Sequence, residues 1–362
     1  MKRYRLLLLF GGRSAEHDVS VASAISMMKA LKDSDIDILP CGITREGTWK
    51  VGEEAVKMLA SSALFAGDSD VRDIVPVDSQ PRSVPEALSA VDVVFPLLHG
   101  PYGEDGTVQG FLELVNVPYV GSGVLGSSLS MDKIAMKKMF ESEGLPITRY
   151  LGILRSDWLS DPEGIISKIE SELEYPVFVK PANLGSSIGI TKAKDRSSLL
   201  QALELASKYD RRLIVEQGVE ARELECAVLG NDYPRASVVG EILPGDEFYT
   251  FEAKYISESS KTIIPADIPP SVSDEIRDYA VRAFKAVDAA GLARVDFFLT
   301  SENKVLVNEI NTIPGFTPIS MYPKLWEASG LSYPDLVRKL LDLAMERHAD
   351  KQHRVIPLWE AS

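Results

Sequence analysis

The sequence ARVDFF, residues 293–298, is followed after a short loop by VLVNEIN, residues 305–311, and the two segments predict a β-hairpin. Side chains alternate across a strand, so the acidic residues of each strand point to one face of the hairpin. A symmetric loop over residues 301–304 places Asp296 opposite Glu309. Directly opposed side chains lie roughly 5 Å apart, and two carboxylates at that separation repel each other. The hairpin therefore predicts a site for a cation.

The same register places Arg294 opposite Asn311. Carboxylate and amide oxygens are hard ligands suited to magnesium, which also binds water and nucleotide phosphates. Two such ions can neutralise the β- and γ-phosphates of a nucleotide during phosphoryl transfer. The alternative is a solvated edge hairpin in which Arg294 forms a salt bridge. The adjoining loop Asn-Thr-Ile-Pro-Gly favours the metal site.

Length and composition indicate a globular protein of several lobes. The chain has 362 residues, of which 45% are hydrophobic and 25% charged, and this length exceeds what one ordinary core organises. A net charge of −14 without a basic patch argues against a nucleic-acid partner. No apolar stretch approaches the roughly 20 residues that span a bilayer, so no membrane partner is expected. The two cysteines, Cys41 and Cys226, are too few for a disulfide framework, so we expect a cytoplasmic location.

The order of predicted elements indicates an α/β region followed by α+β regions. Strands at Arg5–Phe10 and Val91–Leu98 with a helix at Asp18–Leu31 are typical of an open sheet that binds ligands at the carboxyl ends of its strands. A helix over 130–142 follows, and paired strands after Pro176 predict antiparallel sheets. We predict these further strands at 177–180, 188–191, 213–216, 224–230 and 236–241, and helices at 197–208, 271–289 and 334–347.

The stretch YPVFVKPANLGSSIGI, residues 175–190, is a candidate phosphate site. Lys180 ends its apolar strand, and a Gly/Ser loop with Ser186 and Ser187 follows. Small residues let backbone N–H groups approach a phosphate, and the lysine adds a positive charge. The stretch is not a Walker A loop, because the G-x-x-x-x-G-K-[ST] pattern is absent. The alternative is a Gly/Ser turn with no ligand.

Five further residues each have both a functional and a structural interpretation. Lys133 lies in the first turn of a helix and is either a phosphate ligand or a solvated side chain. The spacing of Glu216 and Glu223 suits an adenine amino group and ribose hydroxyls, but both are otherwise structural acids. Glu16 precedes the first helix, where an acid binds either a substrate ammonium or the helix dipole. His99 ends a strand and is either a substrate ligand or a satisfied structural histidine.

Taken together, these segments resemble the D-alanine–D-alanine ligases of the ATP-grasp superfamily. The matching segments are FGGRSAEHDVS, LLHGPYGEDGTVQG, GSGVLGSSLSMDK, VFVKPANLGSSIG, VEQGVEARELE, EAKY, ARVDFF and NEINTIPGFTPISMYPKLW, in the order of that family and over nearly the whole chain. The resemblance implies a three-lobed ATP-grasp fold. It divides the chain into an N-terminal α/β substrate-binding domain (1–128), a central lobe (129–215) and a C-terminal lobe (216–362), with ATP clamped between the last two. It also suggests a homodimer.

The resemblance implies a nucleotide site and a metal site. Its ATP-binding residues are Lys133, Lys180, Ser186, Ser187, Glu216, the backbone of Val219, and Glu223. The two magnesium ions, with manganese as an alternative, are implied at Asp296, Asn311 and a bridging Glu309.

The resemblance also implies the substrate site. Glu16 pairs with the ammonium of the first D-alanine, near His99. Arg294, Ser320 and the backbone of Met321 hold the carboxylate of the second D-alanine, and Gly315 with Arg294 faces the developing oxyanion. Ser186 and Tyr255 form a hydrogen-bonded set with Glu16, and Tyr255 belongs to a closing loop over 248–265.

The implied reaction transfers the γ-phosphoryl group of ATP to the first D-alanine, whose acyl phosphate is attacked by the amine of the second. The dipeptide serves peptidoglycan precursor synthesis. Tyrosine at position 255 favours D-alanine over D-lactate as the second substrate. The alternatives are another carboxylate–amine or D-alanine–D-lactate ligase, and a nucleotide-binding regulator without chemistry. A dinucleotide dehydrogenase is disfavoured, because Gly-Gly-Arg-Ser at 11–14 is not G-x-G-x-x-G.

Overall fold

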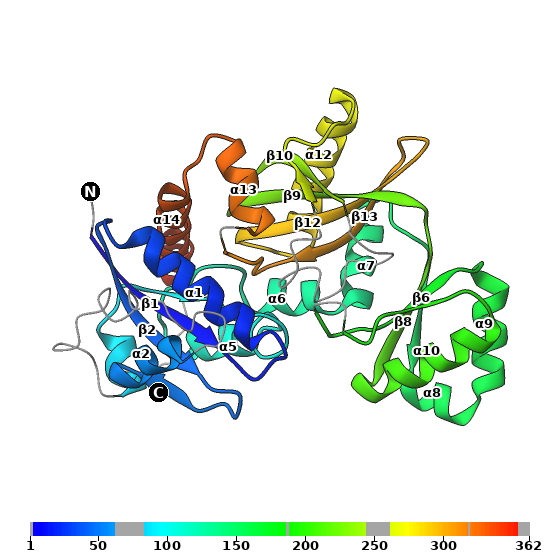
Figure 1. Cartoon of the computed structure of the whole chain (residues 1–362), viewed down its shortest axis with the longest axis horizontal. Helices are drawn as coiled ribbons and strands as arrows, with labels where there is room; N and C mark the ends of the chain where they lie inside the picture. The colour runs from blue at the N-terminus through cyan, green and yellow to red at the C-terminus, as the bar shows by residue number, and fades with distance from the viewer. Residues whose placement is uncertain (1–2, 62–82, 186–187, 244–260, 318, 354–362) are drawn as a thin grey trace, which may run out of the picture.

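The chain folds into three lobes, each built on its own β-sheet (Figure 1). The computed structural model describes residues 3–61, 83–185, 188–243, 261–317 and 319–353. The first sheet has parallel strands and the other two are antiparallel, which confirms the predicted combination of α/β and α+β architecture. Within the described ranges, every helix is too short or too polar to cross a bilayer.

The first lobe is an open sheet in the order β3-β2-β1-β4. Strand β1 is parallel to β2 and β4, whereas β3 is antiparallel to β2. The elements are β1 (Tyr4–Gly11), α1 (His17–Leu31), β2 (Ile36–Ile43), β3 (Trp49–Val51), α2 (Glu53–Ala60), α4 (Val84–Ser89), β4 (Val93–Pro96), α5 (Thr107–Leu114) and α6 (Val124–Met131).

Strand β1 is the centre of this lobe because both of its faces are covered. Leu6, Leu8 and Phe10 pack into one apolar cluster, and Leu7 and Leu9 pack into another on the opposite face. A parallel strand buried on both faces has a continuous apolar sequence, as Leu6 to Phe10 has. Because β1 and β4 are parallel, the loops that follow them emerge at the same edge of the sheet, where Glu16 and His99 lie.

The second lobe is an antiparallel sheet in the order β5-β8-β6-β7. Helix α7 (Lys133–Ser142) leads into it. Its elements are β5 (Tyr150–Leu154), α8 (Arg155–Ser160), α9 (Pro162–Glu172), β6 (Val177–Pro181), β7 (Thr191–Ala193), α10 (Arg196–Tyr209) and β8 (Arg212–Gln217). Apolar residues of all three helices bury one face of this sheet. Figure 1 shows this lobe projecting away from the other two.

The third lobe is an antiparallel sheet in the order β11-β10-β9-β12-β13. Its elements are β9 (Ala221–Gly230), β10 (Arg235–Leu243), β11 (Lys261–Ile263), α12 (Pro270–Ala286), β12 (Gly291–Thr300), β13 (Val305–Asn311), α13 (Met321–Ala328) and α14 (Tyr333–Gln352). Helix α12 packs on one face of the sheet, and α13 and α14 pack toward the first lobe (Figure 1).

The predicted hairpin is present, and a β-bulge sets its register. Next to the loop, Leu299 pairs with Val305 and Phe297 with Val307, one residue out of step with the symmetric loop that we predicted. One extra residue of β13, Asn308, then shifts the pairing, so that Asp296 faces Glu309. Without this bulge, Asn308 would lie opposite Asp296. The predicted pairings Asp296–Glu309 and Arg294–Asn311 are both confirmed.

The helix predicted over 130–142 is two helices, α6 and α7, separated at Asp132. The backbone of Asp132 is extended, and its carboxylate accepts hydrogen bonds from Ile134 N at 3.1 Å and Ala135 N at 2.9 Å. An aspartate in this position caps the helix that follows it. Lys133 is thereby placed in the first turn of α7, as predicted.

Two other predictions differ from the structure. The strand predicted at 188–191 begins only at Thr191, because Gly189 lies in a turn with φ +72°. Helix α13 was not predicted: it is short, and Pro323 obscures its pattern, although proline is tolerated in a first helical turn.

Phe316 joins the first and third lobes in one apolar core. Its ring is fully buried and contacts Phe95 of β4 and Tyr322 of α13, at centroid distances of 5.5 and 5.6 Å, and Tyr333 of α14 at 5.7 Å. Aromatic pairs at such distances add to the free energy of burial. The loop from Thr312 to Gly315 is therefore anchored just beyond its end.

We expect Phe316→Ala to lower the free energy of unfolding by about 3–5 kcal/mol, because it leaves a cavity between two lobes. The measurement is the midpoint of urea unfolding followed by tryptophan fluorescence. Leu159→Ala is the control, since Leu159 is 69% exposed, and its effect should stay within about 0.5 kcal/mol. Equal midpoints for the two variants would contradict the anchoring role.

Candidate active site

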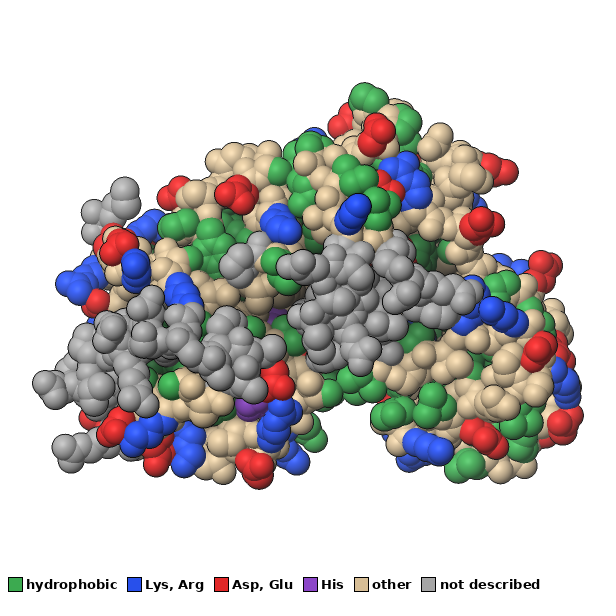
Figure 2. Space-filling view, viewed as in Figure 1, with side chains coloured by type: hydrophobic (Ala, Val, Ile, Leu, Met, Phe, Trp, Pro, Cys, Tyr) green, Lys and Arg blue, Asp and Glu red, His purple; other side chains and the backbone are tan. Residues whose placement is uncertain are grey.

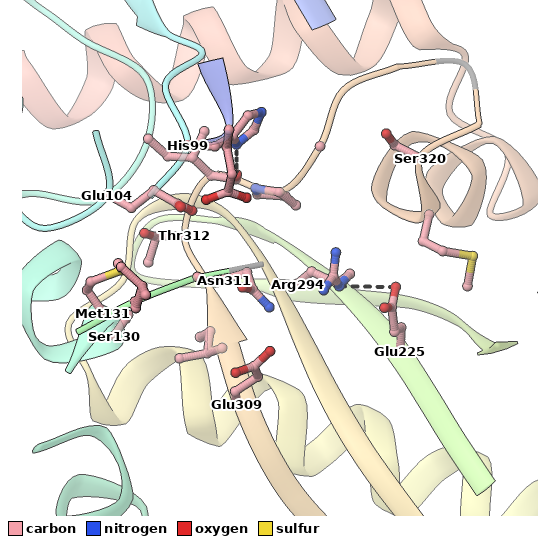
Figure 3. A pocket seen from close by; sticks show the side chains of 18 of the residues that line it. His99, Glu104, Ser130, Met131, Glu225, Arg294, Glu309, Asn311, Thr312 and Ser320 are labelled. Carbon is pink, nitrogen blue, oxygen red and sulfur yellow. Dashed lines mark hydrogen bonds and ion pairs between the residues drawn. The ribbon is translucent and has the colours of Figure 1, made fainter. Parts of the chain in front are cut away.

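A pocket lies where the three lobes meet, and the first, second and third lobes all contribute to its wall. Figure 3 shows its side chains converging from the loop after β4, the end of α6 and strands β9, β12 and β13. The predicted site residues that line it are Glu16, His99, Lys133, Arg294, Glu309, Asn311, Gly315, Ser320 and Met321. Residues far apart in the sequence thus line one pocket.

Arg294 and Asp296 form the centre of the charged wall. Arg294 donates from Nε to Asp296 Oδ1 and from Nη2 to Asp296 Oδ2, both at 2.7 Å. Asn311 Nδ2 donates to Asp296 Oδ2 at 3.1 Å. The structure therefore gives Asp296 cationic and amide partners where the sequence predicted a metal ion.

The donor set fits a hard divalent cation. Asp296 and Glu309 face each other across β12 and β13, and Asn311 can offer its amide oxygen if its side-chain amide turns over. Among the described residues, no three His, Cys, Asp or Glu side chains group closely enough to hold a metal by themselves. Asn311 and a nucleotide would have to complete the coordination.

Lys133 reaches the pocket from the first turn of α7. Its Nζ donates to Leu184 O at 2.7 Å and lies 4.0 Å from Glu309 Oε2. Its backbone N–H also donates to Ala182 O at 3.0 Å. These bonds place the Lys133 ammonium between the loop that follows β6 and the acidic end of β13. A phosphate bound to this ammonium would lie next to that loop and to Glu309.

Lys180 and Glu216 form a buried ion pair beside the pocket wall. Lys180 Nζ lies 2.6 Å from Glu216 Oε2, and Lys137 Nζ of α7 lies 3.3 Å from Glu216 Oε1. Burial alone would raise the pKa of Glu216, but the two ammonium groups outweigh it and lower that pKa to about 2. Glu216 is therefore a firmly ionised acceptor held by two lysines.

The two lysines respond to the same surroundings in opposite ways. Burial lowers the pKa of Lys137, which is fully buried and also donates to Thr148 Oγ1 at 3.1 Å. Burial would likewise lower the pKa of Lys180, but the carboxylates of Glu216, Glu309 and Glu223 outweigh it and raise that pKa. Lys180 thus lies in an acidic environment that a nucleotide phosphate and its metal would alter.

Glu223 lies beside this ion pair, and both Val219 and Glu223 lie outside the pocket wall. Val219 belongs to the connection between β8 and β9, and Glu223 lies on β9 opposite Phe298. Glu223 is close enough to Lys180 to raise its pKa, so the structure groups Lys180, Glu216 and Glu223 together.

Glu16 is buried at the start of α1 and lies against two glycines. A methyl group at Gly100 would be 2.7 Å from Glu16 Oε2, and one at Gly185 would be 3.0 Å from it. Gly100 also has φ +73°, which disfavours other residues. Ser14 Oγ holds the turn by donating to His99 O at 2.6 Å. The glycines let the loops of two lobes close around one carboxylate.

His99 is a buried neutral imidazole. Its Nδ1–H donates to Ile313 O at 3.0 Å, which leaves Nε2 as an acceptor, and no described residue donates to Nε2. Burial lowers the pKa of His99, and the nearby Glu16 offsets this only in part. His99 therefore connects the first lobe to the loop after β13 and can accept a hydrogen bond from a ligand.

Gly315, Ser320 and Met321 form the far wall of the pocket. Ser320 precedes α13, but its side chain does not cap that helix; instead Thr317 N donates to Ser320 Oγ at 3.0 Å. Met321 is the first residue of α13. The first N–H groups of a helix have no intrahelical partner and attract anions, so this wall suits a carboxylate.

Three predicted residues lie outside the described ranges. These are Ser186, Ser187 and Tyr255, together with most of the predicted closing loop. Within the described end of that predicted loop, Lys261–Ile263 form strand β11 paired with β10, and Thr262 of this strand lines the pocket.

The sequence analysis missed three buried or pocket residues: Glu104, Lys137 and Glu225. Glu225 follows Glu223 at the two-residue spacing of a strand, and Lys137 follows Lys133 at the four-residue spacing of a helix, so both signals were available. Glu104 lies in the His-Gly-Pro-Tyr-Gly-Glu-Asp-Gly turn, whose conformation could not be inferred.

Glu104 differs from the other acids because it keeps a proton at neutral pH. Burial raises its pKa, the neighbouring Glu16 raises it further, and the result is about 8, although Gly100 N donates to Glu104 Oε2 at 2.6 Å. Because Glu104 is protonated, the pocket has no second negative charge next to Glu16.

The described part of one face shows how the charged side chains are arranged. Figure 2 shows Lys and Arg side chains interspersed with Asp and Glu side chains over the described part of one face. This face presents no broad basic area of the kind that binds nucleic acid.

Two family models match most of the chain. The model described as D-ala D-ala ligase N-terminus matches residues 5–122, and the model described as D-ala D-ala ligase C-terminus matches residues 139–342. The D-alanine–D-alanine ligase of Bacillus velezensis is 48% identical over 348 residues, covering 95% of this chain and 98% of the relative. That of Acetivibrio thermocellus is 49% identical over 364 residues, covering 96% and 97%.

Solved structures agree with these matches. The D-alanine–D-alanine ligase of Coxiella burnetii superposes with a TM-score of 0.81 at 36% identity, over 97% of each chain. The VanG D-Ala:D-Ser ligase of Enterococcus faecalis superposes with a TM-score of 0.79 at 35% identity, over 95% of this chain and 100% of that one.

The raised pKa of Glu104 predicts a pH-dependent stability. Between about pH 4.5 and pH 8 the folded protein retains a proton that the unfolded carboxyl loses, so stability falls as pH rises through this window. We expect Glu104→Gln to abolish this contribution, so that the melting temperature falls less between pH 5.5 and 8, by on the order of a few degrees. Glu204→Gln, on the exposed face of α10, is the control. Parallel melting curves for the parent and Glu104→Gln would rule out the buried proton.

Proposed function

Because the chain belongs to the D-alanine–D-alanine ligase family, we propose that the pocket between its lobes joins two D-alanine molecules with the energy of ATP. The protein is an ATP-dependent ligase of peptidoglycan precursor synthesis, with the ATP-grasp fold. The observation that supports the residue assignments most strongly is the face of β12 and β13. There Arg294, Asp296, Glu309 and Asn311 meet as two opposed pairs.

ATP binds between the second and third lobes in this proposal. Lys133 and Lys180 contact its phosphates, and the loop with Ser186 and Ser187 supplies further donors. Glu216 and the backbone of Val219 bind the adenine, and Glu223 binds the ribose. The buried ion pair of Lys180 and Glu216 supports this assignment, because a phosphate can take over Lys180 while Lys137 continues to neutralise Glu216.

Asp296, Glu309 and Asn311 would hold two magnesium ions, or manganese ions, with Glu309 between them. Bound there, the ions would neutralise the phosphates during transfer. The fit depends on hard oxygen donors and on Lys133 lying 4.0 Å from Glu309, which brings phosphate and metal ligands together.

The two D-alanines lie on either side of the β12–β13 edge. Glu16 binds the ammonium of the first, and His99 Nε2 accepts a further hydrogen bond from it. Arg294, Ser320 and the Met321 N–H bind the carboxylate of the second at the start of α13. The structure supports this polarity, since the carboxyl group of Glu16 lies on one wall and the N-terminus of α13 lies on the other.

The reaction then follows from these positions. The carboxylate of the first D-alanine attacks the γ-phosphorus of ATP, and the bond to ADP breaks. The amine of the second D-alanine attacks the resulting acyl carbonyl, whose oxyanion accepts hydrogen bonds from Gly315 N–H and Arg294. Phosphate leaves and D-alanyl-D-alanine remains. A loop over 248–265 that carries Tyr255 excludes water, which would hydrolyse the acyl phosphate.

Domain division and location complete the proposal. The three sheets support a division into three domains, which we place at 1–128, 129–215 and 216–362; β8 of the second sheet runs past the last boundary to Gln217. The two cysteines are buried and unpaired, which supports a cytoplasmic protein.

A second acceptor, D-serine, is favoured by the similarity to the VanG D-Ala:D-Ser ligase. D-Lactate is the further alternative, which Tyr255 disfavours.

The proposed activity is tested by phosphate release from ATP and magnesium with D-alanine, L-alanine, or D-alanine plus D-lactate or D-serine, with products identified by mass. We expect D-alanine to give D-alanyl-D-alanine, and Glu309→Gln to lower kcat at least about 100-fold because it removes a ligand that acts on the transferred phosphate. Glu302→Gln, in the exposed loop of the same hairpin, should keep full activity. Release with a different acid only would retain the ATP site and discard the substrate, and release with none would favour a nucleotide-binding regulator.

We also propose a homodimer, with the apolar side chains at the junction of α5 and α6 as its interface. Leu114 is 88% exposed and Leu125 57% exposed, and Gly110 of α5 lies against Val124 of α6. We expect light scattering to give twice the monomer mass. Leu114→Glu with Leu125→Glu should give the monomer, because buried charges oppose association. A monomeric parent would refute the dimer, and a dimeric double variant would refute this interface.

A further inference from the structure

Three carboxylates form a row across the third sheet, and one of them has no assigned role. Asp296 of β12 lies opposite Glu309 of β13 on one side and opposite Glu225 of β9 on the other. Directly opposed side chains on neighbouring strands are roughly 5 Å apart, so the central carboxylate has a like charge on both sides. Glu225 is only 5% exposed and also lines the pocket.

Arg294 is shared between two of these carboxylates. Its guanidinium makes the paired 2.7 Å hydrogen bonds to Asp296, and its Nε lies 3.0 Å from Glu225 Oε2 (Figure 3). A guanidinium has five N–H donors in a planar fork, so it can contact an anchor on one edge and a substrate on another. Glu225 approaches from a different strand than Asp296 and acts as a second anchor.

A conflict arises when Asp296 binds a metal ion. Its oxygens then donate to the cation, and the cation repels the guanidinium of Arg294. With Asp296 as its sole anchor, Arg294 would either compete with the metal or lose its position. A carboxylate on the far side of Arg294 from Glu309 removes this conflict, and β9 places Glu225 there.

We propose that Glu225 is a positioning residue that keeps Arg294 directed at the carboxylate of the second substrate while Asp296 binds the metal. This inference rests on the proposed function and adds a residue to it. Glu225 contacts neither substrate. Its effect is transmitted through Arg294, so it acts on the choice of acceptor and on the metal site together.

The first test is an acceptor competition. D-Alanine and D-alaninamide are supplied together with ATP and magnesium, and the ratio of D-alanyl-D-alanine to D-alanyl-D-alaninamide is measured by mass. The parent should favour the acceptor with a free carboxylate. We expect Glu225→Gln to lower this ratio about tenfold, which corresponds to about 1.4 kcal/mol of discrimination. A purely structural role would reduce both products equally, and that outcome would overturn the proposal.

Glu241→Gln is the matched control. Glu241 of β10 is 4% exposed and receives two 2.7 Å hydrogen bonds from Arg222, but it pairs with Leu224 and so points to the opposite face of the sheet from Glu225. Its loss should lower stability without changing the product ratio. A ratio that falls equally in both variants would show a general effect on the sheet and would refute the positioning role.

The second test is independent of ligase activity. Binding of Mn²⁺ to the protein with a non-hydrolysable ATP analogue and no D-alanine is measured by the loss of the free-ion electron paramagnetic resonance signal, and the loss caused by the analogue without protein is subtracted. In Glu225→Gln the guanidinium pairs with Asp296 alone and competes with the ion, so we expect Mn²⁺ to bind several-fold more weakly, and Glu241→Gln to match the parent. Unchanged Mn²⁺ affinity in Glu225→Gln would overturn the proposal. If the parent makes neither product but the Mn²⁺ result holds, the proposed substrates fail and the role of Glu225 remains.

Discussion

The opposition of Asp296 and Glu309 is the constraint on which the site depends. Two carboxylates on facing strands are unfavourable unless cations surround them, and the structure supplies Arg294, Lys133 and Lys180 around that face. The second and third lobes supply these cations: β12 carries Arg294, the start of α7 carries Lys133 and β6 carries Lys180. The lobes therefore meet where the cations of one lie close to the carboxylates of another, and the pocket lies at this junction.

Neighbouring charges also decide the protonation of two other acids in and beside the pocket. Glu216 is neutralised by two lysines and stays ionised, whereas Glu104 lies next to Glu16 and keeps a proton. An acid of the pocket and an acid beside it thus have opposite protonation states at neutral pH, because their neighbours differ in the sign of their charge.

The sequence predicted the strands and the opposed pairs, because alternation and apolar runs fix which face a side chain occupies. It predicted Asp296 opposite Glu309 from a symmetric loop, yet the pairing arises from a different loop register and a bulge at Asn308. The bulge does not alter the order of apolar and polar residues from Val305 to Asn311, so this order does not reveal it. The break at Asp132 and the turn at Gly189 were equally hidden, since both depend on backbone angles that neighbouring residues permit but do not dictate. Glu225 was overlooked because its partner, Arg294, lies 69 residues further along the chain, and only the sheet order brings them together.

The first turn of α7 is attached to one lobe while the body of the helix packs on another. Asp132 binds Asn183 and Arg212 of the second lobe, whereas Met136 and Phe140 pack into the core of the third. A movement that separates the two lobes must therefore pivot close to Asp132, where displacements are smallest. Lys133 is the next residue after this attachment, so a rotation between the two lobes would move its backbone less, relative to the second lobe, than it would move the far end of α7.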